Sequence, residues 1–220
     1  LASLLALVLQ PAAAQDPDLA ILNVDSNGDL VPGGGSLLDI SGNGRYALIW
    51  SDDPLLPEDT VGQQVYVHDL ETGTLELISL DFNGNPIADG TQNPNARDPM
   101  NRRYISDDGR YALFATFSPN VVPGFTPTNI FDVHVYRRDR QTQTTTLITV
   151  DNNDVPADRG VTGWMMDPTG VAALFVTQAT NVVVVGPPGV GKSHLCAAVG
   201  HHLIEQGQTV RWYATATLMQ

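Results

Sequence analysis

Short apolar runs alternate with polar positions along the first 180 residues, and turn-forming residues separate these runs. The stretch 40–50 (ISGNGRYALIW) returns at 105–115 (ISDDGRYALFA) and, more loosely, at 166–176 (MDPTGVAALFV). Alternation with a period of two, preceded directly by Asn-Gly or Asp-Gly, is typical of strands joined by tight turns. We therefore predict antiparallel β-sheets built from a repeated unit.

A second block of sequence repeats between these stretches. Residues 65–86 (VYVHDLETGTLELISLDFNGNP) return at 135–156 (VYRRDRQTQTTTLITVDNNDVP), and a trace of the same pattern lies at 21–32. The tetrapeptide ETGT at 71–74 predicts a hairpin turn between two strands. No amphipathic helical stretch separates the strands, which excludes parallel βαβ units here.

The two blocks resemble the TolB-like β-propeller repeat, whose units carry S-x-D-G-R-Y before a strand and V-x-D-x-x-T-G in a hairpin. The resemblance covers about residues 20–180, and it implies a mainly β domain (16–180) that binds a protein or a small ligand. About two and a half repeats are present, whereas propellers close with roughly four to eight blades. We therefore expect a partial propeller with antiparallel blades.

The pattern changes after residue 180. Four consecutive valines at 182–185 predict a buried parallel strand, and apolar residues at helical spacing predict a helix over 193–206. The stretch 209–214 (TVRWYA) is typical of a further strand. Residues 181–220 are thus expected to form a truncated α/β P-loop NTPase element joined to the β domain.

A phosphate-binding motif lies between the predicted strand and helix. The eight residues Gly186, Pro187, Pro188, Gly189, Val190, Gly191, Lys192 and Ser193 fit G-x-x-x-x-G-K-[ST]. Glycines let the backbone N–H groups curl around a phosphate, and the lysine supplies a charge for the β- and γ-phosphates. The Ser193 hydroxyl is a candidate Mg²⁺ ligand, so ATP and Mg²⁺ are the expected cofactors. The alternative is a glycine-rich turn that matches by chance.

The run from 181 to 220 resembles the IstB-like ATP-binding proteins, which are transposase helper ATPases related to the DnaC helicase loaders and the AAA+ class. The resemblance implies that the motif residues contact nucleotide, together with His194 directly after them. It also implies a transposase and DNA as partners. The family's acidic Walker B pair, sensor residue and arginine finger have no counterpart in these 220 residues. We therefore expect ATP binding without hydrolysis, and no catalytic residue is assigned.

Charge is distributed unevenly between the two parts. The chain carries −13 overall, and since residues 181–220 carry +1, the first 180 residues carry −14. Lys192 is the only lysine, which supports a boundary near residue 180. Such an acidic segment is a poor partner for nucleic acid phosphates, so the charge does not support the DNA partner.

The first fifteen residues, LASLLALVLQPAAAQ, have the pattern of a secretory signal peptide, with a buried apolar helix as the alternative. The run is too short to span a bilayer, so no membrane span is expected in the mature chain. A signal peptide indicates a periplasmic or secreted protein, whereas a P-loop element indicates the cytoplasm. The two predictions of localisation conflict.

The two halves share a short identical stretch where one gives way to the other. The second repeat continues as SPNVVPG (118–124), and the third continues as ATNVVVVG (179–186). We therefore hypothesise a chimera of two unrelated coding sequences joined at Asn-Val-Val. The alternative function is a secreted or periplasmic propeller that binds or scaffolds, without enzymatic activity.

Other candidate chemistry is weaker. Asp- and Asn-rich stretches at 25–29, 81–85 and 151–154 have oxygen ligands for calcium but lack the glutamate of an EF-hand, so turns between strands are the favoured interpretation. His68 and His134 are expected to be ordinary strand residues. The single cysteine and the histidines after the P-loop show no metal-binding spacing.

Overall fold

The computed structural model describes residues 24–59, 61–93, 103–127, 129, 132–150, 155–157, 160–177, 182–185, 189, 197 and 201. Within these residues the protein is mainly β, and it has ten strands in three antiparallel sheets. The signal-peptide-like segment 1–15 and the predicted strand 209–214 lie outside the described residues. Neither prediction is tested here.

The first sheet has four strands in the order β1-β2-β3-β4. Their bounds are β1 Gly35–Ile40, β2 Tyr46–Ser51, β3 Gln64–Asp69 and β4 Leu75–Leu77. The predicted hairpin between the two last strands is confirmed, and Gly73 in its turn has a φ of +73°. The sheet is therefore an up-and-down meander in which each strand pairs with the next.

The second sheet repeats this arrangement. Its strands are β5 Tyr111–Thr116, β6 His134–Asp139 and β7 Thr144–Leu147, in the order β5-β6-β7. They correspond to β2, β3 and β4 of the first sheet. The place of β1 is held by a single bridge between Ile105 and Ala112.

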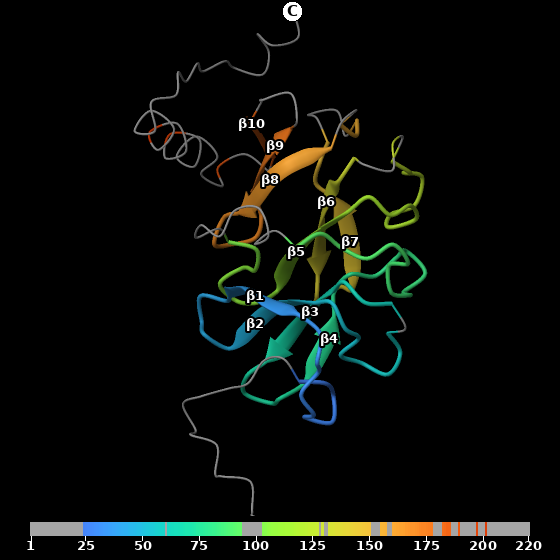
Figure 1. The fold of residues 1–220 in the computed structure, drawn as a ribbon. Coiled ribbons are helices and arrows are strands. Elements are labelled where there is room, and N and C mark those ends of the chain that lie inside the picture. Colours follow the sequence, from blue (N-terminus) through green and yellow to red (C-terminus); the bar gives the residue numbers. More distant parts are fainter. Residues whose placement is uncertain are drawn as a thin grey trace, which may run out of the picture.

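The third sheet has the order β10-β9-β8, with β8 Val161–Met166, β9 Ala173–Thr177 and β10 Val182–Val185. By position these strands correspond to β1, β2 and β3. Figure 1 shows the three sheets following one another through the molecule, from the blue and teal first sheet to the orange third sheet. The described residues do not close into a ring.

One hydrophobic core runs through all three sheets. Buried residues of the first sheet (Leu48 and Trp50), the second (Phe114) and the third (Trp164 and Phe175) belong to the same cluster. A smaller cluster of Leu55, Tyr66 and Leu77 covers part of the opposite face of the first sheet. The repeated apolar positions thus pack sheet against sheet, as aligned layers do.

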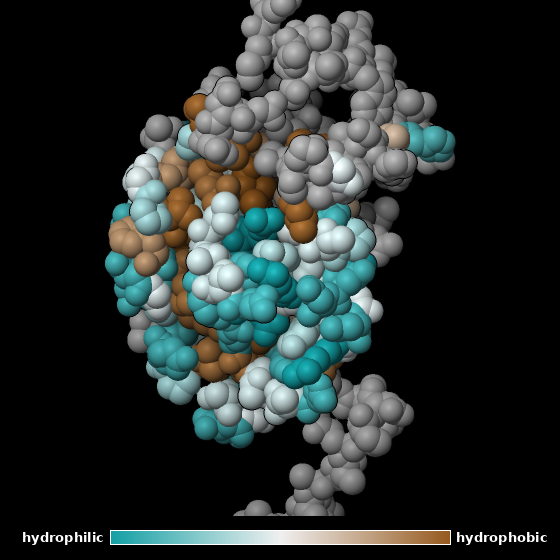
Figure 2. All heavy atoms as spheres, turned by 180° about the vertical axis from the view of Figure 1, so that it is seen from behind, coloured by the Kyte–Doolittle hydropathy of each residue, from teal (hydrophilic) through white to brown (hydrophobic). Residues whose placement is uncertain are grey.

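The surface seen from behind is largely polar. In Figure 2, teal and white residues cover much of the described part of that face, and brown hydrophobic residues show in a band along one side. No helix among the described residues is long and apolar enough to cross a membrane.

Candidate functional site

The predicted phosphate-binding loop directly follows the last described strand. Gly189 is the one motif residue that the structure describes; it is exposed, and it lies in a turn with a φ of +85°. A Cβ at this position would have no atom within 4 Å, so the backbone conformation and not crowding favours glycine here. The other predicted nucleotide residues, 186–188 and 190–194, lie outside the described residues.

The strand that leads into this loop differs from the sequence-based prediction. Val182–Val185 was predicted to be a parallel strand, but β10 pairs antiparallel with β9. Val182 lies opposite Val176, and Val185 lies opposite Ala173. The prediction was wrong because a run of β-branched residues indicates a strand buried on both faces without fixing the direction of its neighbour.

The two valines of the shared Asn-Val-Val have different structures in the two repeats. In the second repeat, Asn120 has a φ of +65° and Val121 is buried in the loop after β5. In the third repeat, Val182 and Val183 are already part of β10. The chain therefore leaves the pattern of the second repeat at this point and forms a strand where that repeat has a loop.

The helix expected after the loop is described at two residues. Ala197 and His201 have helical backbone and are exposed. The rest of the predicted helix, 193–206, lies outside the described residues, so the α/β element as a whole is not confirmed.

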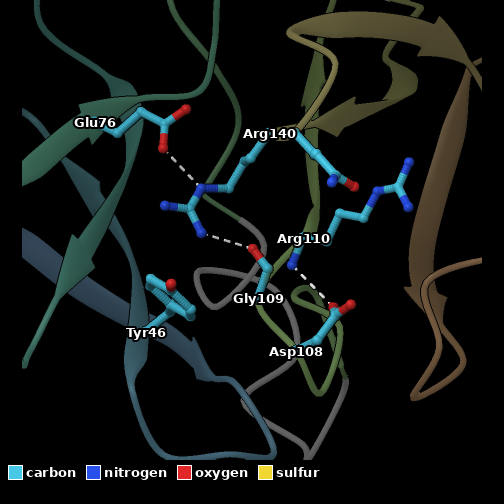
Figure 3. A pocket seen from close by; sticks show the side chains of 7 residues that line it. Tyr46, Glu76, Asp108, Gly109, Arg110 and Arg140 are labelled. Atoms are coloured by element: carbon cyan, nitrogen blue, oxygen red, sulfur yellow. Dashed lines mark hydrogen bonds and ion pairs between the residues drawn. The ribbon is translucent and has the colours of Figure 1, made fainter.

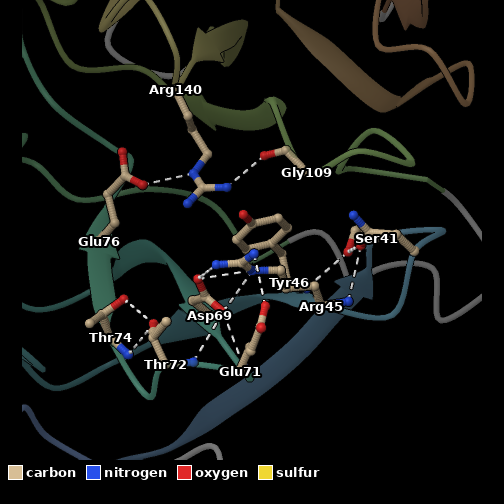
Figure 4. A network of polar contacts seen from close by, with 11 residues as sticks. Ser41, Arg45, Tyr46, Asp69, Glu71, Thr72, Thr74, Glu76, Gly109 and Arg140 are labelled. Carbon is tan, nitrogen blue, oxygen red and sulfur yellow. Dashed lines mark hydrogen bonds and ion pairs between the residues drawn. The ribbon is translucent and has the colours of Figure 1, made fainter.

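The described sheets contain a second set of functional candidates, which connects the two repeated sequence blocks. Arg45, before β2, donates to both carboxylate oxygens of Asp69 at the end of β3, with Nη2 to Oδ2 at 2.7 Å. Arg110 donates to Asp139 in the same way, with Nε–Oδ1 at 3.0 Å and Nη2–Oδ2 at 2.7 Å. Figure 4 shows the first of these forks. The arginine of one block therefore fixes the aspartate of the other.

These aspartates also hold the hairpin that follows each of them. Asp69 Oδ1 accepts from the backbone N–H groups of Glu71 and Thr72, and Asp139 Oδ1 accepts from those of Gln141 and Thr142. The hydrogen bonds from Arg45 lower the pKa of Asp69 to about 2. Those from Arg110 lower the pKa of Asp139 further. Both carboxylates are therefore ionised over the whole physiological range.

The tyrosine that follows each of these arginines packs against a turn of the next sheet. A Cβ on Gly109 would overlap the ring of Tyr46, and a Cβ on Gly170 would overlap Tyr111. Both glycines have positive φ, +74° and +72°. Only glycine meets both requirements at these turns, because the αL backbone and the missing side chain are needed together.

Arginines cover the same two rings. The guanidinium of Arg140 lies 4.5 Å from the centroid of Tyr46, and that of Arg137 lies 4.8 Å from the centroid of Tyr111. Arg140 also donates to Glu76 Oε2 at 2.7 Å and to the carbonyl oxygen of Gly109 at 2.7 Å. One arginine of the second sheet thus joins an aromatic ring and a carboxylate of the first sheet.

An open groove of about 310 Å³ lies at this seam between the first two sheets (Figure 3). Its lining consists of Tyr46, Glu76, Asp108, Gly109, Arg110, Arg140 and Gln141. Both arginines in it are already paired with carboxylates. The groove therefore serves the contact between sheets, and its mixed charges define no single class of ligand.

The first two Asp-rich stretches form turns, as the sequence indicated. Asp25 Oδ1 accepts from the N–H groups of Asn27 and Asp29, and Asp81 Oδ1 accepts from those of Asn83 and Asn85. No group of three or more metal-ligating residues occurs among the described residues. Residues 151–154, the third such stretch, lie outside them. At the first two stretches, one carboxylate oxygen already closes its own turn.

The two strand histidines are buried, as expected of ordinary strand residues. His134 lies on β6, and its Nδ1 is 3.0 Å from the Thr149 hydroxyl. His68 lies on β3, and burial lowers its pKa, as it does for His134. Sequence reasoning missed Tyr46, Arg140 and Glu76; the repeated Arg-Tyr pair was the available signal for the first of them.

Three comparisons with known proteins bear on the C-terminal segment and on the sheets. Residues 166–220 match the family profile described as IstB-like ATP binding protein. "Putative insertion sequence ATP-binding protein y4iQ/y4nD/y4sD" of Sinorhizobium fredii is 46% identical over 46 residues, which are 21% of this chain. "Uncharacterized protein YdaV" of Escherichia coli is 43% identical over 49 residues, 22% of this chain. This chain spans 15% and 20% of the lengths of these two relatives.

Among solved structures, the tricorn protease is similar with a TM-score of 0.38 and 16% identity, over 66% of this chain and 11% of that chain. A TM-score of that size assigns no fold.

The family match begins in the last residue of β8, so it includes β9 and β10. Residues 166–220 therefore match an IstB-like ATP-binding domain, and one of the two relatives is described as a putative insertion sequence ATP-binding protein.

Proposed function

We propose that this chain binds ATP, with Mg²⁺, through the loop 186–193. The single observation that carries the proposal is the complete motif G-x-x-x-x-G-K-S directly after a strand, within the segment that matches the IstB-like profile. Gly186, Gly189 and Gly191 would turn backbone N–H groups toward the phosphates. Lys192 would lie beside the β- and γ-phosphates, and Ser193 would be a Mg²⁺ ligand.

The strand before the loop supports this proposal. A phosphate-binding loop needs a fixed starting point, because its N–H groups act only when their directions are held. β10 pairs with β9 along its whole length, from Val182 to Val185. Gly189, four residues after the strand, has the positive φ that a curled loop requires of glycine.

Binding without hydrolysis is the form of the function that we propose for these 220 residues. Phosphoryl transfer depends on positioning and on groups that hold Mg²⁺ and orient water. The segment 181–220 contains one acidic residue, Glu205, and so offers no acidic pair for that role. By resemblance, this ATP binding would serve transposition or replication in the cytoplasm, as in the family of helper ATPases.

A second candidate function rests on the sheets. The Arg45–Asp69 and Arg110–Asp139 ion pairs join the two repeated sequence blocks in the first and the second sheet. We propose as the alternative that residues 16–180 act as a binding or scaffolding surface of a propeller-like protein, secreted or periplasmic, without enzymatic activity. This function would need none of the loop residues.

A nucleotide titration separates the two candidates. ATP with Mg²⁺ is titrated into the full chain and followed by calorimetry, alongside Lys192→Ala and the matched control Arg211→Ala. Arg211 is the other basic residue of the segment 181–220 and lies outside the motif. Binding that is lost in Lys192→Ala and retained in Arg211→Ala supports the first function. No binding at millimolar ATP removes it and leaves the second.

A further inference from the structure

The turn before the second strand of each sheet is packed in two sheets and open in the first. Gly109 lies against Tyr46, and Gly170 lies against Tyr111, each tyrosine belonging to the preceding sheet. Gly44 is the equivalent glycine of the first sheet and has the same φ of +74°, but a Cβ there would meet no atom within 4 Å. Gly44 therefore has the position that packs against a tyrosine ring in the other two sheets, but no tyrosine ring lies against it.

Burial of the residue four positions earlier follows the same pattern. Ile105 in the second sheet is 0% exposed, and Met166 in the third is 1% exposed. The equivalent residue of the first sheet, Ile40, is 44% exposed. The large apolar side chain at this position is buried in the two sheets that follow another sheet, and it is exposed in the first sheet, which no described sheet precedes.

The backbone N–H group of this same residue also has a different kind of acceptor in the first sheet than in the other two. The N–H of Ile105 donates to Asp39 Oδ2 of the preceding sheet, at 3.2 Å, and that of Met166 donates to the carbonyl oxygen of Arg103, at 2.9 Å. The N–H of Ile40 instead donates to the carboxylate of its own neighbour, Asp39, at 2.8 Å. A local side chain thus satisfies the donor that a preceding sheet satisfies elsewhere.

Leu37 extends the exposed patch along β1. It is 45% exposed, and it lies opposite Ile49, two residues along β2 from Ala47, which lies opposite Ile40. Leu37 and Ile40 are therefore on one face of the sheet. The smaller core cluster lies on that face at Tyr66 and Leu77, over β3 and β4, and neither Leu37 nor Ile40 belongs to it.

We propose that Leu37, Ile40 and Gly44 form a docking surface for one more sheet of this same repeat, which presents an Arg-Tyr pair at the start of its second strand. The tyrosine ring would lie on Gly44, as Tyr46 lies on Gly109. A backbone or carboxylate oxygen beside it would accept the N–H of Ile40. The same contact between a tyrosine ring and a glycine turn already occurs twice in the molecule. The proposal does not depend on ATP binding.

The occupant is a sheet with an Arg-Tyr pair and not the third sheet of a second copy. In the third sheet, Val171 and Ala172 stand where the other two sheets have arginine and tyrosine. Ala172 has no ring to place on Gly44. Leu174 on the following strand is 4% exposed, so it is already covered within its own chain.

The sequence allows the occupant to be supplied within the full chain. Val24 pairs with Leu30 as Val150 pairs with Pro156, so both valines begin the same kind of turn. An extra copy of residues 103–149, inserted between residues 23 and 24, would therefore place a sheet with its own Arg-Tyr pair directly before the first sheet. Amide hydrogen exchange at Ile40 is the readout.

We expect the inserted sheet to slow exchange of the Ile40 amide at least tenfold. The protection should be lost when the copied tyrosine is changed to alanine, and also with Gly44→Asn, whose side chain occupies the ring's place while asparagine tolerates the αL backbone. Gly73→Asn is the control, because Gly73 also has a positive φ and open surroundings. It should retain the protection.

Two outcomes overturn the proposal. One is unchanged exchange at Ile40 although circular dichroism shows that the inserted sheet is folded. If that copy does not fold, a copy of residues 35–79, which carries Arg45 and Tyr46, replaces it, and unchanged exchange there counts equally. The other is a dimer of the natural chain, measured by sedimentation, that Gly44→Asn dissociates; the occupant would then be a second copy.

Discussion

Gly109 lies so close to the ring of Tyr46 that a single added methyl group would overlap it. The two residues are 63 positions apart in sequence, and they join the turn of the second sheet to the first sheet. Gly170 and Tyr111 repeat the relationship between the third sheet and the second. The order of the sheets therefore depends on a contact that only glycine allows.

The first prediction compares two glycines that share a backbone conformation. Gly109→Ala and Gly44→Ala each place alanine at a φ of +74°, which costs about 1–2 kcal/mol. Gly109→Ala also forces its Cβ into Tyr46, and such overpacking costs about 1–3 kcal/mol more. Chemical denaturation should therefore show Gly109→Ala to be the less stable variant. Equal stabilities would mean that the tyrosine contact does not hold the sheets together.

The second prediction concerns pH. The pKa of Asp69 is lowered to about 2, and that of Asp139 is lowered as well, whereas a free aspartate titrates near 3.9. Because both folded-state values are depressed, their contribution to stability is complete above about pH 4 and is lost as the pH falls toward 2. Denaturation midpoints measured from pH 6 to pH 2 should therefore decrease between pH 4 and pH 2.

Two variants isolate the cause of this pH dependence. Asp69→Asn should lower stability at pH 6 and flatten the slope below pH 4. Glu71→Gln removes the other acidic partner of Arg45, at 2.8 Å, but Glu71 has a 68% exposed side chain and should leave the slope nearly unchanged. A wild-type slope in Asp69→Asn would assign the titration to other carboxylates.

The repeats show how much of this fold can be predicted from sequence. Turn dipeptides such as Asp108-Gly109 and alternating strands specify antiparallel sheets, because both act over a few residues. The hairpin at Gly73 and the turn at Asp81 follow for the same reason. The Tyr46–Gly109 contact does not follow from local pattern, since it depends on how one sheet stacks on the next.

The strand before the phosphate-binding loop shows more clearly what cannot be predicted from sequence. Four valines indicate a buried strand, but the direction of the neighbouring strand depends on which partner occupies the adjacent place in the sheet. β9 occupies that place and runs antiparallel. The motif at 186–193 can be predicted from sequence because its glycines and Lys192 have chemical roles that require a fixed spacing.

The third prediction concerns the metal ion. If the Ser193 hydroxyl is a ligand of Mg²⁺, Ser193→Ala should weaken ATP binding in the presence of Mg²⁺ about tenfold and leave binding in excess chelator nearly unchanged. Ser118→Ala is a matched control just after β5, where the hydroxyl donates to Asp89. The account of the metal site fails if Ser193→Ala weakens binding equally with and without Mg²⁺.

The fourth prediction concerns the origin of the chain. If the join at Asn181 arose by assembly of mixed DNA reads, genomic DNA of the source gives no continuous product across codons 175–190, whereas a join by recombination gives one. Primer pairs within codons 40–120 are the control, and they should amplify normally. One continuous product of the expected length and sequence would show that the two parts are encoded together.

The central claim is that backbone N–H groups between 186 and 193 bind the phosphates of ATP. Amide NMR of the full chain, with glycines labelled, tests it at the atoms involved. The account predicts saturable shifts of the Gly186, Gly189 and Gly191 amides on addition of ATP with Mg²⁺, and their loss in Lys192→Ala. Amides that do not move at millimolar ATP, in a chain whose Gly109 and Gly170 signals show it to be folded, would contradict the claim.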